Sequence, residues 1–136
     1  MFAIRYVTDE DKAFWFTLDS HMSESEFELK IRDKRGYIIS DCGKPVGLMR
    51  YNLFWDIVPF LNLIEIEDSH QGKGFGKQAM THWENEMHGK GHKLVMTSTQ
   101  SDEQAQFFYR KLGYADCGCL MLGKEPLEIL FVKNLD

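Results

Sequence analysis

Two kinds of apolar pattern alternate along this chain. Short apolar stretches rich in β-branched and aromatic residues are typical of strands, and turn residues such as glycine, proline and aspartate separate them. These stretches predict strands over residues 2–7, 37–40, 46–54, 60–67, 94–99, 114–122 and 127–132. Some of the segments between them instead repeat apolar residues at helical spacing, which predicts helices.

The helical pattern occurs in several separate segments. They begin near Thr8, at Ser23 or Ser25, near Gly74 and after Ser101. Glycine commonly follows the last turn of a helix, so we expect the second helix to end at Gly36 and the last at Gly113. Ser101 and Gln104 have the spacing of a capping box, which predicts that the last helix begins there.

The order of these elements indicates the class of fold. It runs strand, two helices, three strands, helix, strand, helix and two strands. The strand–helix–strand segment in the middle is typical of a crossover connection, so the order predicts an α/β fold with one mixed sheet. A chain of 136 residues has the size of one domain and contains no linker-like stretch. We therefore expect a single domain over residues 1–136.

Composition narrows the class of protein further. Hydrophobic residues make up 43% of the chain and charged residues 27%, as in globular domains. A formal net charge of -5 argues against general nucleic-acid binding, which needs a cationic surface. The N-terminal segment lacks the pattern of a secretory signal, and no apolar stretch approaches the length of a membrane span. We expect a cytoplasmic protein with neither nucleic acid nor membrane as partner.

The cysteines and histidines do not have the spacing of metal ligands. Cys117 and Cys119 enclose a single glycine, unlike the Cys-x-x-Cys of zinc and redox sites, and Cys42 stands alone. The histidines form no cluster with ligand spacing. We predict reduced thiols and no bound metal.

Residues 71–77, Gln-Gly-Lys-Gly-Phe-Gly-Lys, carry the clearest chemical signal in the chain. Glycines allow sharp turns and let a ligand approach the backbone closely. The helix that follows presents unpaired N–H groups and the positive end of its dipole, and Lys73 and Lys77 add charge. This combination predicts a site for a phosphate-bearing ligand.

Two common phosphate-binding motifs do not fit this loop. A P-loop needs glycine at position 71 and serine or threonine at position 78, where this chain has Gln71 and Gln78. The dinucleotide fingerprint needs a third glycine at position 77, which is Lys77. The loop therefore belongs to neither class.

A third motif does fit. Gln71, Gly74 and Gly76 match Gln/Arg-x-x-Gly-x-Gly/Ala between an apolar strand and a helix. One strand later, residues 105–114 match Ala-x-x-Phe-Tyr-x-Lys-x-Gly-Phe/Tyr. In these motifs, and in the order of elements over nearly the whole chain, the sequence resembles the GNAT superfamily of N-acetyltransferases. The resemblance implies the GNAT fold and a loop that binds the pyrophosphate of acetyl-CoA.

The resemblance also implies which residues contact acetyl-CoA. The backbone of Ile64 and Ile66 would bind the pantetheine arm, while their side chains belong to the core. The loop contacts would come from Gln71, Gly72, Lys73, Gly74, Phe75, Gly76 and Lys77. Asp102 stands where the family commonly has an asparagine that contacts the pantetheine or the acceptor. An aspartate accepts but does not donate a hydrogen bond, so Asp102 either contacts the cofactor or only adds charge near the helix.

Two catalytic candidates follow from the same resemblance. Tyr109 matches a tyrosine that donates a proton to the departing sulfur, and a phenol keeps its proton at neutral pH. A core aromatic is the alternative. The family's glutamate corresponds to Phe60, with Asn62 next on the same face. Glu65 is the nearest carboxylate, and alternation places it on the opposite face unless a bulge changes the parity. A base acting through water, or a solvated Glu65, are the alternatives.

The implied function is transfer of the acetyl group of acetyl-CoA to a primary amine, directly in a ternary complex. The acceptor is a small-molecule or peptide amine, and Trp55 with Asp56 either receives a cationic amine or packs against another surface. The family's habit of association favours a homodimer. A catalytically weak or inactive acyl-CoA-binding regulatory module is the alternative function, because the glutamate is missing and Asp102 replaces asparagine.

Overall fold

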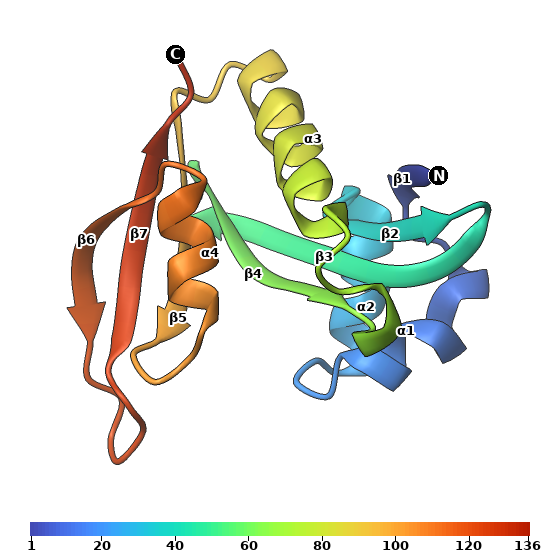
Figure 1. Ribbon diagram of the computed structural model, residues 1–136, viewed down its shortest axis with the longest axis horizontal. Coiled ribbons are helices and arrows are strands. Elements are labelled where there is room, and N and C mark those ends of the chain that lie inside the picture. The colour runs from blue at the N-terminus through green and yellow to red at the C-terminus, as the bar shows by residue number, and fades with distance from the viewer. The chain divides into compact units, whose positions relative to one another are not determined.

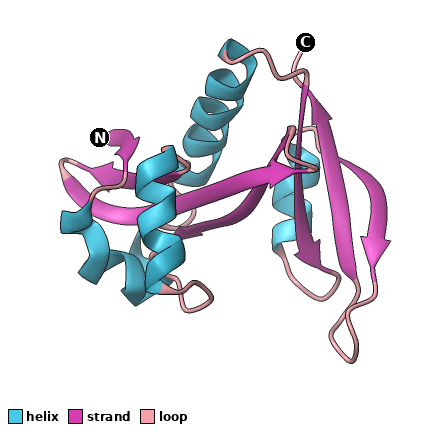
Figure 2. Ribbon diagram, turned by 180° about the vertical axis from the view of Figure 1, so that it is seen from behind, coloured by secondary structure: helices cyan, strands magenta, loops and turns pink.

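The computed structural model describes residues 1–136, and its elements follow the predicted order (Figures 1 and 2). The strands are β1 (Phe2–Tyr6), β2 (Gly36–Asp41), β3 (Lys44–Phe54), β4 (Val58–Ile66), β5 (Leu94–Gln100), β6 (Ala115–Leu120) and β7 (Glu128–Asn134). The helices are α1 (Lys12–Leu18), α2 (Glu24–Asp33), α3 (Phe75–Gly89) and α4 (Ala105–Lys111). Every predicted strand and helix is present, with small shifts at the ends.

Hydrogen bonds place the strands in the order β1-β2-β3-β4-β5-β7-β6. β4 and β5 are parallel, with Phe60 opposite Met96, and α3 is the crossover between them. β1 with β2, β2 with β3, β5 with β7 and β6 with β7 are antiparallel. The sheet is therefore mixed, and the predicted α/β fold class is confirmed.

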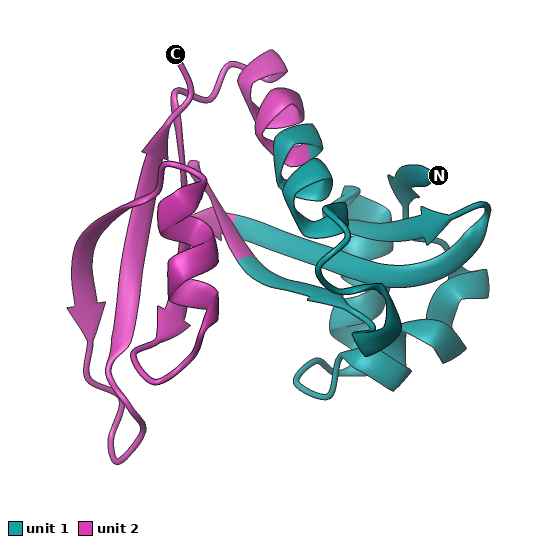
Figure 3. Ribbon diagram, in the orientation of Figure 1, with its two compact units in different colours: residues 1–52, 62–82 teal, residues 53–61, 83–136 magenta.

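The chain forms two compact units, which Figure 3 colours separately. Unit 1 contains residues 1–52 and 62–82, and unit 2 contains residues 53–61 and 83–136. The boundaries fall inside β3, β4 and α3, so the chain passes from one unit to the other within regular elements. The single-domain organisation stays a prediction.

Unit 1 covers its strands with helices on both faces. On one face, Trp15 of α1 and Phe27 of α2 lie 5.5 Å apart between ring centroids and pack with Leu48 of β3. On the other face, Tyr37 of β2 meets His82 of α3 at 6.2 Å. Figures 1 and 2 show the same arrangement, with α1 and α2 on the side opposite the first turns of α3. Burial from both sides explains why β2 is an almost continuous apolar run.

An ion pair ties the start of α1 to the first strand. Both Nη atoms of Arg5 donate to the carboxylate of Asp11 at 2.8 Å, and the Thr8 N–H donates to the same group at 2.8 Å. The Arg5 guanidinium and the Thr8 N–H hold the pKa of Asp11 below its usual value, although burial acts in the opposite direction. The Asp11 side chain therefore satisfies the N–H of the N-cap residue Thr8, as in a capping box.

Replacing Asp11 by asparagine should lower the free energy of unfolding at neutral pH by about 1–2 kcal/mol, because Arg5 keeps one partner fewer while remaining half exposed. The stability that Asp11 contributes is present above its unfolded pKa, near 4, and is lost as pH falls through its lower folded pKa. Urea unfolding between pH 2 and 7 should therefore show a shallower acid loss in Asp11→Asn. Glu24→Gln, which removes an exposed pair with Lys12, should change little.

The expected end of the second helix is wrong by two residues. Lys34, not Gly36, takes the left-handed conformation that closes α2, with φ of 57°. Gly36 instead begins β2, where a Cβ would lie 2.8 Å from Cγ1 of Val7. The glycine is therefore required by close packing in the sheet rather than by the helix terminus.

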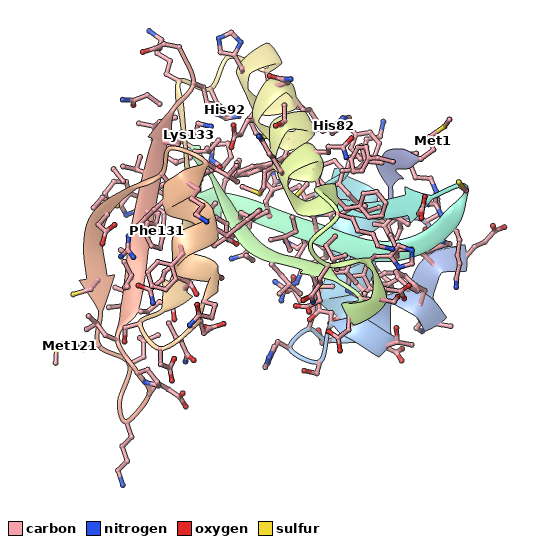
Figure 4. The ribbon with its side chains drawn as sticks, viewed as in Figure 1. Met1, His82, His92, Met121, Phe131 and Lys133 are labelled. Atoms are coloured by element: carbon pink, nitrogen blue, oxygen red, sulfur yellow. The ribbon has the colours of Figure 1, made fainter.

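Unit 2 contains the strand ladder β5-β7-β6, with α4 against β5, together with the start of β4 and the end of α3. Phe131 and Lys133, labelled in Figure 4, lie on one face of β7. Phe131 packs on Tyr109 of α4 at 6.0 Å, and Lys133 bonds the carboxylate of Glu84 at 2.7 Å. Tyr114 donates to the same carboxylate at 2.8 Å. Burial raises the pKa of Tyr114, and the charge of Glu84 adds to this.

The expected capping box of the last helix is also wrong. α4 begins at Ala105, and Gln104 is its N-cap residue rather than its third helical position. The preceding residues form a turn in which the Glu103 side chain accepts from the Gln100 N–H at 3.0 Å. This local hydrogen bond competes with the helix and delays its start.

Candidate functional site

The glycine loop joins β4 to α3 within unit 1. A short 3-10 helix over Asp68–His70 comes first, and the glycines follow. Gly72 and Gly74 have φ of 75° and 86°, which side chains other than glycine rarely adopt. A Cβ at Gly72 would meet nothing within 4 Å, and one at Gly74 only Nε2 of Gln78 at 4.0 Å. Both glycines thus face open space that a ligand can occupy.

Other residues of the loop hold its shape. The Gln71 side chain donates to the carbonyl of Ile66 at 2.9 Å, which links the loop to the end of β4. Phe75 is buried, stacks on His70 at 5.8 Å and lies 6.0 Å from Phe2 of β1. His70 in turn lies 3.0 Å from a carboxylate oxygen of Glu67. Gln71 and Phe75 therefore position the loop, while its glycines leave the backbone accessible.

The electrostatics of the loop favour an anion. The first hydrogen bond of α3 runs from the Gln78 N–H to the carbonyl of Gly74 at 3.1 Å, so the N–H groups of residues 75–77 have no partner within the helix. The helix has 15 residues, and its positive end points to the loop. Lys73 and Lys77 are both exposed beside it. These features fit a diphosphate.

Strand β4 leads into this loop. Leu63 packs against the core cluster of α1 and α2, and Asn62 borders a pocket beside α2. Glu65, two residues after Leu63 in the same strand, lies on the face of Leu63. The role of Glu65 as a base stays a prediction.

The two isoleucines of β4 lie beside β3. A Cβ at Gly47 would come within 2.6 Å of Cδ1 of Ile66 and 2.7 Å of the Glu65 carbonyl oxygen. Glycine at this position therefore allows the two strands to approach closely. Ile64 and Ile66 are half-buried, as expected of residues whose side chains belong partly to the core.

The candidate residues of unit 2 differ in exposure. Tyr109 is 5% exposed and packs edge-on against Tyr114 at 5.7 Å. Its burial suits the core interpretation, and its role as an acid stays a prediction. Asp102 is exposed in the turn before α4, three residues ahead of the first helical residue Ala105. It therefore adds no charge inside the first helical turn.

Trp55 and Asp56 form the tight turn between β3 and β4. Their φ values of 55° and 65° are those of a two-residue hairpin turn, which is unusual for a bulky aromatic residue. Trp55 is 77% exposed and lies 4.6 Å from the ring of Phe54. The two interpretations of Trp55, an acceptor contact or a packing surface, both stay open.

The sequence analysis missed a pocket of about 630 Å³ in unit 1, between α2, β3 and β4. It contains the cations Lys30, Arg35 and Arg50 together with Asn52 and Asn62. These residues are scattered over the chain and form no motif. The available signal was the polar pair Arg50 and Asn52, which interrupts an otherwise apolar strand.

The structure contains no group of three or more histidine, cysteine or acidic side chains that could hold a metal ion. All three cysteines are free and exposed. No helix has the length and apolar character needed to cross a membrane.

Comparison with known proteins identifies the family. The sequence model described as the Acetyltransferase (GNAT) family matches residues 4–114, which is most of the chain. The protein therefore belongs to the GNAT family of acetyltransferases, as the two sequence motifs indicated. Among curated proteins, no sequence matches this chain significantly.

Solved structures share the fold at low sequence identity. Ard1 from Thermoplasma volcanium has a TM-score of 0.84 at 14% identity, over 98% of this chain and 97% of its own. The ribosomal-protein-S18-alanine N-acetyltransferase from Escherichia coli has a TM-score of 0.82 at 15% identity, over 99% of this chain and 94% of its own. The spermidine/spermine N-acetyltransferase SpeG from Vibrio cholerae has a TM-score of 0.78 at 15% identity, over 98% of this chain and 92% of its own. These likenesses establish the GNAT fold.

Proposed function

We propose that this protein transfers the acetyl group of acetyl-CoA to a primary amine, directly within a ternary complex. The observation that carries the proposal is the loop over residues 71–77. Its two left-handed glycines, free helix N–H groups and exposed lysines are suited to the pyrophosphate of the cofactor. Membership of the GNAT family supports the same cofactor.

The proposed roles follow the path of the cofactor. Gly72, Gly74 and Gly76 offer backbone N–H groups to the pyrophosphate, and Lys73 and Lys77 add charge. Gln71 and Phe75 hold the loop in place. The backbone of Ile64 and Ile66 would bind the pantetheine arm along β4, and Asp102 stays a candidate acceptor of a hydrogen bond from the cofactor.

The proposed reaction forms a C–N bond and breaks a C–S bond. The neutral amine nitrogen attacks the thioester carbonyl carbon, and the thiolate leaves. The amine gives up a proton to Glu65, directly or through water, and Tyr109 donates a proton to the sulfur. Glu65 is proposed as the base because it is the nearest carboxylate to the usual place of the family's glutamate. None of the three cysteines lies in the glycine loop or on β4, which favours direct transfer over a covalent acetyl-enzyme.

The test is an assay of CoA thiol release from acetyl-CoA against a panel of primary amines, with the acetylated product identified by mass spectrometry. We expect amine-dependent release above the rate of hydrolysis. Calorimetry with acetyl-CoA, run on the same preparation, measures cofactor binding separately. If the protein binds acetyl-CoA but acetylates no amine, the alternative function as an acyl-CoA-binding regulatory module is favoured. The observation that supports this alternative is Phe60, which stands where the family usually has a glutamate. Protein that binds no acetyl-CoA would contradict both functions.

Cytoplasmic location and self-association as a homodimer stay predictions. Light scattering at micromolar concentration decides the second, and a monomeric mass would contradict it.

A further inference from the structure

The pocket beside α2 is separate from the glycine loop and is large enough for a small molecule. Its volume is about 630 Å³, within the range of ligand sites. Lys30 comes from α2, Arg35 from the connection after it, and Asn62 from β4. The pocket therefore brings charged groups of a helix to the strand that leads into the cofactor loop.

Some of the charges around this pocket are already neutralised. Arg50 donates to Asp19 at 2.8 Å, and Asp19 is fully buried. Asp33 is paired with Arg32 at 2.9 Å. The charges that remain are the cations Lys30 and Arg35 and the carboxylate of Glu26, which is exposed on the first turn of α2.

The cationic side of the pocket lacks a carboxylate for Lys30 to bind directly. Its Nζ donates to the neutral carbonyl of Tyr51 at 3.0 Å. Burial lowers the pKa of Lys30, and the charges of Arg50 and Arg35 act in the same direction, while the charges of Glu26 and Asp33 oppose them. An anionic group bound here would relieve this repulsion and accept from Lys30 and Arg35.

The pocket also lies within reach of a ligand held by the loop. Asn62 lines it, and Ile66 is the last residue of the same strand before the loop. Four strand residues span roughly 13 Å. A cofactor anchored at the loop and extended back along β4 therefore points its far end toward this pocket.

We propose that this pocket binds the acceptor and that Lys30 and Arg35 select an amine that also carries a carboxylate, as amino acids do, over simple amines and polyamines. The inference rests on the acetyl transfer proposed above, because it assigns the second substrate of that reaction. Hydrogen bonds from the two cations to a carboxylate are charge-assisted and strong. The same cations disfavour an ammonium group in the pocket, which helps to keep the attacking nitrogen neutral.

The test compares amines that differ only in the carboxylate. Phenylalanine with phenethylamine, tryptophan with tryptamine, and lysine with cadaverine are titrated into nitrogen-15-labelled protein saturated with CoA, while the side-chain amide signals of Asn52 and Asn62 are followed. We expect the amino acid of each pair to bind at least about tenfold more tightly. Arg35→Gln should remove this difference, and Arg35→Lys should restore part of it. Lys44→Gln is the control, because Lys44 is an exposed cation at the start of β3 that does not line the pocket.

Kinetics give a second readout. Arg35→Gln should raise KM for an amino acid by about tenfold, whereas KM for its decarboxylated partner should not rise, because the cation disfavours an ammonium group. Equal or tighter binding of the decarboxylated amines, or no saturable shift at Asn52 and Asn62 with any of these compounds, would overturn the inference. If the amino acids bind more tightly than the decarboxylated amines but no CoA thiol is released, the proposed acetyl transfer is contradicted. The proposal that the pocket selects a carboxylate would still hold.

Discussion

Gly74→Glu should weaken acetyl-CoA binding by at least about 100-fold, measured by calorimetry. The substitution places a carboxylate at the start of α3, where the pyrophosphate is proposed to bind, and like charges repel. A Cβ at this position meets only the flexible side chain of Gln78, so the variant has room to fold. The left-handed φ of 86° should cost about 1–2 kcal/mol of stability.

Gly123→Glu is the matched control for this variant. Gly123 also has a left-handed φ, 63°, and a Cβ there would meet nothing within 4 Å, but it lies in the β6–β7 connection of unit 2. The two variants should show similar losses in thermal unfolding, and only Gly74→Glu should lose acetyl-CoA. Normal binding by Gly74→Glu would show that the loop is a plain connection between strand and helix.

Tyr109→Phe should lower kcat by about 100-fold or more and leave the Kd of acetyl-CoA unchanged. The reason is that phenylalanine keeps the ring contacts with Tyr114 and Phe131 but cannot give a proton to the leaving sulfur. Without the proton donor, the remaining rate should depend more steeply on the basicity of the leaving thiolate. Thioesters of more acidic thiols, which are better leaving groups, should therefore partly rescue the variant.

Tyr114→Phe separates this chemical role from a structural one. Tyr114 is a buried neighbour whose hydroxyl donates to Glu84, so its loss leaves a partly buried carboxylate with one partner fewer. This variant should be less stable by about 1–3 kcal/mol and retain its kcat at a temperature where it is folded. Equal kcat in wild type and Tyr109→Phe would assign Tyr109 to the core alone.

The elements and the loop were predictable because each depends on neighbouring residues. In α3, Ala79, Met80, Trp83 and Met87 recur at helical spacing in the sequence, and all four side chains are buried. Gly72 and Gly74 have the left-handed conformations that only glycine adopts freely. The ends of helices were less predictable. Lys34 rather than Gly36 closes α2, because packing against Val7 requires the glycine elsewhere.

The sequence by itself determined the order of strands and helices and the glycine-rich turn that leads into α3. Both depend on contiguous residues, through the spacing of apolar side chains and the backbone freedom of glycine. Only the tertiary structure decided which cations surround the pocket. Lys30, Arg35 and Asn62 meet because helix and strand pack together, and no pattern along the chain records that meeting.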